Sequence, residues 1–204
     1  MLNRLRSFTL ILLFFILLLT APTKSYAQDF DNVFVQLYGG QFVDMDFMGL
    51  FTLEDVDKTK DAYMLTVGAG VEKYIWQDYL GFGIEGNVGL HWGYHDPTFY
   101  EFSGGPYLRW YLFPWSKKLK TFVTLGDGLS YNTRYAQYEY DYGSSSDNLE
   151  ARLLNFLFFE VGVGVTDNVD IYYRAHHRCS AWGTVGFPEG AGVNFHTMGL
   201  RYNF

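Results

Sequence analysis

Apolar and polar side chains alternate along several segments of the chain, and this period of two constrains the fold more than any other feature. In residues 80–92, one set of alternate positions is apolar and ends in an aromatic residue: Phe82, Ile84, Val88, Leu90 and Trp92. The last residues of the chain repeat the pattern with Met198, Leu200, Tyr202 and Phe204. Because successive side chains of a β-strand point to opposite faces, both segments are predicted to be strands with one apolar face. The 17 Tyr, 19 Phe and 22 Gly, against five Pro, favour many short strands over helices.

The first 27 residues have the pattern of a secretory signal peptide. Arg4 and Arg6 give a positive start, an apolar run spans residues 8–20, and small residues stand at Ser25 and Ala27 in the spacing that a signal peptidase cleaves. That apolar run is shorter than the roughly 20 residues that a transmembrane helix needs. We therefore expect cleavage after Ala27.

The mature chain, residues 28–204, is predicted to be a single outer-membrane β-barrel domain. No segment after Ala27 has an apolar run long enough for a transmembrane helix, and only helices and closed barrels satisfy their backbone hydrogen bonds in lipid. A soluble sandwich or barrel would show the same period of two. However, a last strand that ends in Phe204 resembles the terminal signature of outer-membrane barrels, which their assembly machinery recognises. We therefore expect an all-β, eight-stranded antiparallel transmembrane barrel in a bacterial outer membrane.

Eight segments of the mature chain are predicted to be the strands: 32–41, 61–75, 80–92, 99–113, 120–131, 151–165, 169–177 and 194–204. The connections 76–78, 114–118 and 166–168 are short, 42–60, 132–150 and 180–192 are long, and 91–98 is intermediate. Short turns face the periplasm in barrels of this kind, so both termini are expected on the periplasmic side.

Charge and cysteine content exclude two classes of interaction. The leader removes Arg4, Arg6 and Lys24 and no acid, which changes the formal net charge from −7 to −10. A chain this acidic offers no basic stripe to phosphates, so nucleic acid is excluded as a partner. Cys179 is the single cysteine of the sequence, so no intrachain disulfide can form.

Polar and reactive side chains are predicted on the lipid-facing wall near the outer end of the last two strands. The outward set of the seventh strand continues to His177 and Cys179, and that of the eighth includes Asn194. An imidazole against hydrocarbon costs free energy unless it is hydrogen-bonded, so this cluster is a candidate functional site. We predict that His177 takes the proton of the Cys179 thiol and that Asn194 orients the imidazole, as in acyl transfer. At the depth of the outer leaflet, this chemistry suggests hydrolysis of a lipid ester.

Several motifs resemble those of the PagL-type lipid A 3-O-deacylases, a family of outer-membrane acyloxyacyl hydrolases. They are Gly126–Tyr131, Arg152–Asn155, Glu160, Tyr173–Arg178, Gly192–Asn194 and Gly199–Phe204. The resemblance covers most of the mature chain, and its specific part is the segment that contains His177. It implies a carboxylic ester hydrolase that removes an acyl chain from lipopolysaccharide in the outer leaflet of a Gram-negative outer membrane. Neither a metal nor an organic cofactor is implied.

Three positions depart from the family pattern, in which a His-x-Ser pair supplies base and nucleophile and an acid on the next strand orients the His. Cys179 replaces the Ser, Asn194 replaces the acid, and Ser180 stands where an Asn often assists the oxyanion. Glu189, in the loop between the last two strands, is the alternative orienting acid. A thiol is a competent nucleophile, but one buried among apolar groups is inert. The alternative is therefore a non-catalytic barrel that stabilises the membrane or binds a partner.

Lipid A and the outer-membrane lipids are the predicted partners, and a homodimer is left open. Inside the barrel, charged side chains are predicted to fill the lumen. Glu85 and Arg109 are expected to pair with each other, and His176 is expected to bond Asp170 or Glu160.

Overall fold

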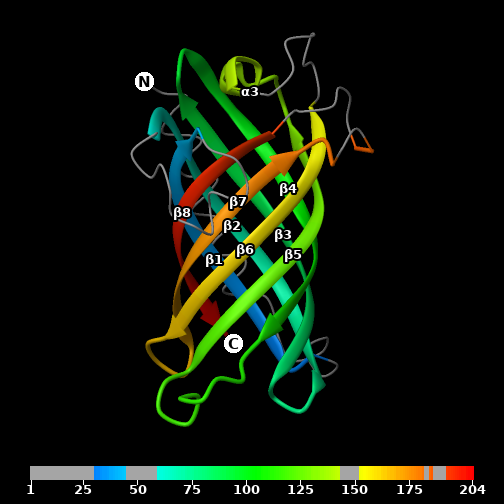
Figure 1. The fold of residues 1–204 in the computed structure, drawn as a ribbon, viewed down its shortest axis with the longest axis vertical. Helices are drawn as coiled ribbons and strands as arrows, with labels where there is room; N and C mark the ends of the chain where they lie inside the picture. Colours follow the sequence, from blue (N-terminus) through cyan, green and yellow to red (C-terminus); the bar gives the residue numbers. More distant parts are fainter. Residues whose placement is uncertain (1–29, 45–58, 143–151, 182–183, 186–191) are drawn as a thin grey trace. The chain divides into compact units, whose positions relative to one another are not determined.

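The computed structural model describes residues 30–44, 59–142, 152–181, 184–185 and 192–204, and these form a closed antiparallel barrel (Figure 1). Its strands are β1 (Asn32–Val43), β2 (Thr59–Trp76), β3 (Leu80–Gly93), β4 (Asp96–Trp110), β5 (Thr121–Asn132), β6 (Leu153–Gly164), β7 (Val169–Cys179) and β8 (Gly192–Asn203). Each strand pairs with its neighbours in the chain, and β8 pairs with β1 to close the barrel. The predicted eight-stranded barrel is confirmed. The first and last residues of each predicted strand lie within three residues of those of the observed strand.

The alternation of side chains between the two faces of the wall is also confirmed. On β3, Ile84 is 55% exposed on the outside, whereas Glu85 beside it is 3% exposed in the lumen. On β8, Met198 is 59% exposed and Arg201 is 1% exposed. In membrane barrels an outward belt of this kind lies against the hydrocarbon. Among the described residues, no helix is long and apolar enough to cross a membrane.

The lumen is filled by a network of buried arginine and glutamate side chains. Glu160 on β6 accepts hydrogen bonds from Arg174 at 2.6 Å, from Arg201 at 2.9 Å and from Arg109 at 3.4 Å. An eight-stranded barrel is just wide enough for its own side chains to fill it. The predicted pair of Glu85 with Arg109 is wrong. Arg109 bonds Glu72 at 2.7 Å instead, because the register sets it opposite Gly81, four residues from Glu85 on β3.

His176 points into the lumen as predicted, but its predicted partners are wrong. Its Nε2 lies 3.1 Å from Glu101, which also lies 2.8 Å from Nε2 of His91. Glu160 stands opposite Arg174 in the register, and its carboxylate is already paired with arginine side chains. Asp170 is six residues back on the same strand, close to the β6–β7 turn, where it bonds residues of that end of the barrel.

The three connections that were predicted to be short lie at one end of the barrel, and the chain ends there too. They join β2 to β3, β4 to β5 and β6 to β7, and Figure 1 shows them around the C-terminus. At this end the amide of Asn32 on β1 donates to Asn203 on β8 at 3.0 Å. The helix α3 (Gln137–Tyr142) lies at the opposite end.

The connection between β3 and β4 is tighter than the sequence pattern predicts. Instead of an intermediate loop over residues 91–98, the two strands continue to Gly93 and from Asp96. The two residues between them, Tyr94 and His95, both have positive φ, at 47° and 66°. This is the backbone of a two-residue hairpin turn whose twist matches that of the strands.

Candidate active site on the outer wall

His177 and Asn194 face each other on the outward parity of the paired strands β7 and β8. The register sets them directly opposite, and Nδ1 of His177 lies 2.7 Å from Oδ1 of Asn194. An amide oxygen can only accept, so the bond places the imidazole proton on Nδ1 and the lone pair on Nε2. Asn194 can therefore fix the tautomer that a general base requires.

Both side chains are more enclosed than a lipid-facing position implies. His177 is 8% exposed and Asn194 is 4% exposed. Val43, which stands opposite Asn194 on β1, is buried as well. The two side chains therefore point away from the lumen, but neighbouring residues cover most of their surface.

Cys179 stands two residues beyond His177 at the end of β7 and is partly exposed. Its nearest cross-strand neighbours are Asn155 on β6 and Gly192 on β8. A Cβ on Gly192 would lie 3.6 Å from Cβ of Cys179 and 3.7 Å from Cε1 of His177. Cβ of Cys179 and Cε1 of the imidazole thus border the same small space, which stays open because position 192 has no side chain.

Two further residues lie beside the thiol, Asn155 and Asp127, which the sequence analysis places in the family-like motifs but not in the site. The thiol of Cys179 donates to Oδ1 of Asn155 at 3.6 Å. The amide of Asn155 in turn donates to Asp127 on β5 at 2.6 Å and to the carbonyl of Gly128 at 2.9 Å. Asp127 is exposed on the outward parity of β5, between apolar positions, and that break in the apolar set was the available signal.

Arg178, between the histidine and the cysteine, points into the lumen and anchors the end of β7. Its Nε donates to Ser130 at 2.7 Å, one Nη donates to the carbonyl of Arg152 at 3.0 Å, and the other pairs with Glu139 of α3. The guanidinium is fully buried. The backbone that carries the candidate site is therefore held from inside the barrel.

Two predicted site residues remain, Ser180 and Glu189. Ser180 is buried directly after β7, and its carbonyl accepts from the amide of Val185 at 3.0 Å. Glu189 lies outside the described residues. Within the described part of the chain, no group of three His, Cys, Asp or Glu side chains could hold a metal ion.

Comparison with known proteins shows the fold of this chain but not its family. No family model matches the chain, and no curated protein matches it. The crystal structure of the outer membrane enzyme PagL is similar with a TM-score of 0.55 at 12% identity, over 83% of this chain and 98% of that one. The fold is that of an outer-membrane barrel. Neisserial surface protein A also matches, with a TM-score of 0.49 at 17% identity over 84% of this chain and 97% of its own.

The similarity to PagL shows the fold that the two proteins share. At 12% identity it does not extend to membership of the deacylase family. That resemblance, the signal peptide and the periplasmic termini stay predictions.

Proposed function

We propose that this chain is an outer-membrane esterase that hydrolyses an ester-linked acyl chain of lipopolysaccharide, in the manner of the lipid A deacylases. The observation that carries the proposal is the 2.7 Å bond between His177 and Asn194 on the outer wall, two residues along β7 from Cys179. A base with a fixed tautomer next to a nucleophile is the general arrangement of acyl transfer. The similar fold of PagL, itself an outer-membrane enzyme, adds support.

The proposed location sets the substrate class. With the β2–β3, β4–β5 and β6–β7 connections and both termini on the periplasmic side, the end of β7 lies in the outer leaflet. Lipopolysaccharide supplies the ester-linked chains at that depth, and a site on the outer wall meets them without removing them from the membrane. No metal or organic cofactor enters the proposed reaction.

In the first step, Nε2 of His177 takes the proton from the Cys179 thiol, and the sulfur attacks the ester carbonyl carbon. The tetrahedral intermediate collapses to a thioester when the sugar oxygen leaves with the proton from the imidazolium. In the second step, His177 takes a proton from water, whose oxygen attacks the thioester carbonyl carbon. The C–S bond then breaks, the sulfur of Cys179 takes the proton back from the imidazolium, and the fatty acid is released. Asn194 holds the imidazole orientation throughout both steps.

The test is to express the chain in a Gram-negative outer membrane and to weigh its lipid A by mass spectrometry. We expect the loss of one acyl chain, abolished by Cys179→Ala and by His177→Ala. Cys179→Ser is expected to preserve or raise the activity, because the deacylase pattern has Ser at this position. His95→Asn changes a histidine in the β3–β4 turn and serves as the matched control. Unchanged lipid A mass beside a correctly folded barrel would contradict the proposal.

A second candidate is a non-catalytic barrel that stabilises the membrane or binds a partner. The observation that favours it is the hydrogen bond from the thiol to Asn155, an interaction that stabilises the protonated sulfur. The two candidates differ in one measurement, since only the esterase changes the mass of lipid A.

A further inference from the structure

The thiol of Cys179 can give its proton to only one neighbour at a time. In the structure it donates to Oδ1 of Asn155 on β6 at 3.6 Å. The proposed esterase requires that the same proton passes to Nε2 of His177. Because a thiol carries a single proton, the two arrangements exclude each other. The bond to Asn155 must therefore break before the sulfur can act as a nucleophile.

The orientation of the Asn155 side-chain amide is fixed by two acceptors on β5. Its Nδ2 donates to Oδ1 of Asp127 at 2.6 Å and to the carbonyl oxygen of Gly128 at 2.9 Å. If the amide turned over, its Oδ1 would face both of these oxygens, and neither can donate to it. Nδ2 therefore stays toward β5, and Oδ1 stays toward the thiol.

An amide oxygen in this position favours the protonated sulfur over the thiolate. Oδ1 of Asn155 can only accept, so it stabilises a thiol that donates to it and repels a negative charge on the sulfur. The carboxylate of Asp127 lies one hydrogen bond further away and acts in the same direction, because a like charge disfavours a second one nearby. Since the thiolate is the reactive form of cysteine, this arrangement lowers the reactivity of Cys179.

The position of Asp127 on the wall is unusual for a carboxylate. It points outward from β5 between Leu125 and Leu129, which are both exposed on the same face. In a membrane barrel this face lies against lipid, where packing alone favours an apolar side chain and a charged one is costly. An ionisable group at such a depth is a functional candidate, and its hydrogen bond to Asn155 connects it to the proposed nucleophile.

We propose that Asp127 is a positioning residue that acts through Asn155 to hold the Cys179 thiol protonated and directed toward β6. When the bond to Asn155 breaks, the proton passes from the sulfur to Nε2 of His177 and leaves a thiolate beside an imidazolium. The inference rests on the proposed esterase function for His177 as the acceptor of this proton. The hold on the thiol itself can be measured without lipid A.

The test follows the alkylation of the folded barrel by N-ethylmaleimide in detergent, with intact mass as the readout. Cys179 is the single cysteine of the sequence, so the mass increase reports on this thiol alone. Asp127→Asn keeps the size of the side chain but can donate to Oδ1 of Asn155, which allows that amide to turn over. We expect alkylation at neutral pH to be roughly two- to tenfold faster, the worth of about one hydrogen bond. The pH profile of the alkylation rate should also move to lower pH, which a purely structural role for Asp127 would not produce.

A second variant tests whether Asp127 acts through Asn155. Asn155→Ala removes the acceptor and should also speed alkylation. In that background, Asp127→Asn should change the rate less than it does alone, because no amide remains for the carboxylate to orient. An equal effect of Asp127→Asn in both backgrounds would overturn the role of Asn155.

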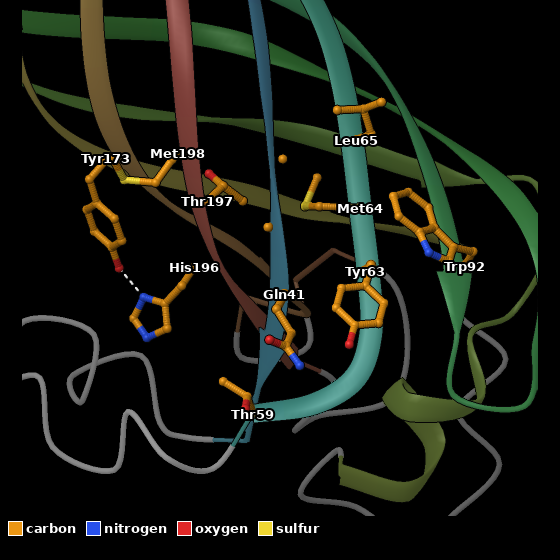
Figure 2. A pocket seen from close by; sticks show the side chains of 12 residues that line it. Gln41, Thr59, Tyr63, Met64, Leu65, Trp92, Tyr173, His196, Thr197 and Met198 are labelled. Carbon is orange, nitrogen blue, oxygen red and sulfur yellow. Dashed lines mark hydrogen bonds between the residues drawn. The ribbon is translucent and has the colours of Figure 1, made fainter. Parts of the chain in front are cut away.

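Two controls separate this effect from a general change of the wall. Asp78→Asn makes the same charge change in the β2–β3 turn at the other end of the barrel. Tyr173→Phe removes an outward phenol of β7 that bonds Nδ1 of His196, as the dashed line in Figure 2 shows. Both should be alkylated like the unaltered protein. An unaltered rate and pH profile for Asp127→Asn would overturn the proposal.

Failure of this inference and failure of the esterase give different results. Faster alkylation of Asp127→Asn in a barrel that leaves lipid A unchanged would contradict the esterase and retain the hold on the thiol. Loss of an acyl chain from lipid A, together with equal alkylation of Asp127→Asn and the unaltered protein, would contradict the hold and retain the esterase.

Discussion

Two pairs of polar side chains on the outer wall of this barrel are joined by hydrogen bonds. His177 bonds Asn194, and Tyr173 bonds His196. Each pair joins neighbouring strands β7 and β8, so the polar atoms meet within the wall. An unpaired polar group against hydrocarbon would cost several kcal/mol. Pairing therefore reduces the cost of carrying chemically active groups on a lipid-facing surface.

At the scale of single residues, Asn194→Ala is expected to lower kcat/KM for lipid A by about five- to 150-fold. The substitution leaves Nδ1 of His177 without its partner, a loss of about 1–3 kcal/mol, and releases the tautomer that the base needs. The rate is measured from the acyl chains released per unit of folded protein. Asn203→Ala, which removes a hydrogen-bonded asparagine at the far end of β8, is the control and should retain the full rate. Equal rates for the two variants would exclude an orienting role for Asn194.

At the scale of elements, the end of β7 depends on a contact that crosses the mouth of the barrel. Arg178 on β7 pairs with Glu139 on α3 inside the lumen, while His177 and Cys179 lie on the other side of the same backbone. Tyr138 of α3 is buried as well, with its hydroxyl 3.1 Å from Nδ1 of His91. The helix therefore acts as an inner support for the strand that carries the candidate site.

A double-mutant cycle tests this support. Arg178→Met and Glu139→Met should each destabilise the folded barrel by about 3–5 kcal/mol, because each leaves one buried charge without its partner. The double variant should lose less than the sum, since it removes both charges together. Urea unfolding in phospholipid vesicles measures all three free energies. Additive losses would mean that the two side chains do not interact.

The elements themselves could be predicted from the sequence, whereas most side-chain partners could not. The alternation predicts which residues of β3 and β8 face outward, because the period of a strand is two. Continuing the same alternation along β7 predicts that His177 faces outward. The same alternation predicts that His176 faces the lumen, but its partner Glu101 is 75 residues away on β4. Which strands meet across the lumen depends on the stagger of the closed barrel, which no local pattern encodes. The bond between Cys179 and Asn155 escaped prediction because it needs the register of β6 with β7.

At the scale of the whole molecule, one carboxylate connects strands from around the barrel. Glu160 contacts Arg109 of β4, Arg174 of β7 and Arg201 of β8, and all four side chains are fully buried. These buried ion pairs connect strands across the lumen, in addition to the backbone hydrogen bonds that join neighbouring strands of the wall. The network is thus expected to contribute to the stability of the whole barrel rather than of one hairpin.

Glu160→Gln should therefore destabilise the barrel by about 3–5 kcal/mol, since it removes the charge shared by three buried arginines. The comparison is Lys60→Gln, which removes the charge from a partly exposed pair with Asp44 at 3.9 Å and should cost about 0–1 kcal/mol. Urea unfolding in vesicles measures both variants. A cost for Glu160→Gln as small as that for Lys60→Gln would show that the arginines are compensated by the other carboxylates of the lumen.

The apolar belt makes a prediction that distinguishes a membrane barrel from a soluble one. Ile84 and Ile75 are both outward and similarly exposed, at 55% and 57%, but Ile84 lies within β3 and Ile75 lies beside the short β2–β3 turn. An arginine on the lipid face costs about 2–4 kcal/mol at the bilayer midplane and about 0–1 kcal/mol near the interface. In phospholipid vesicles, Ile84→Arg should therefore be destabilised by about 2–4 kcal/mol and Ile75→Arg by less than about 1 kcal/mol, as measured by urea unfolding. Equal and small losses at the two positions would mean that water rather than hydrocarbon surrounds the belt, and the outer-wall site would then have no acyl chains within reach.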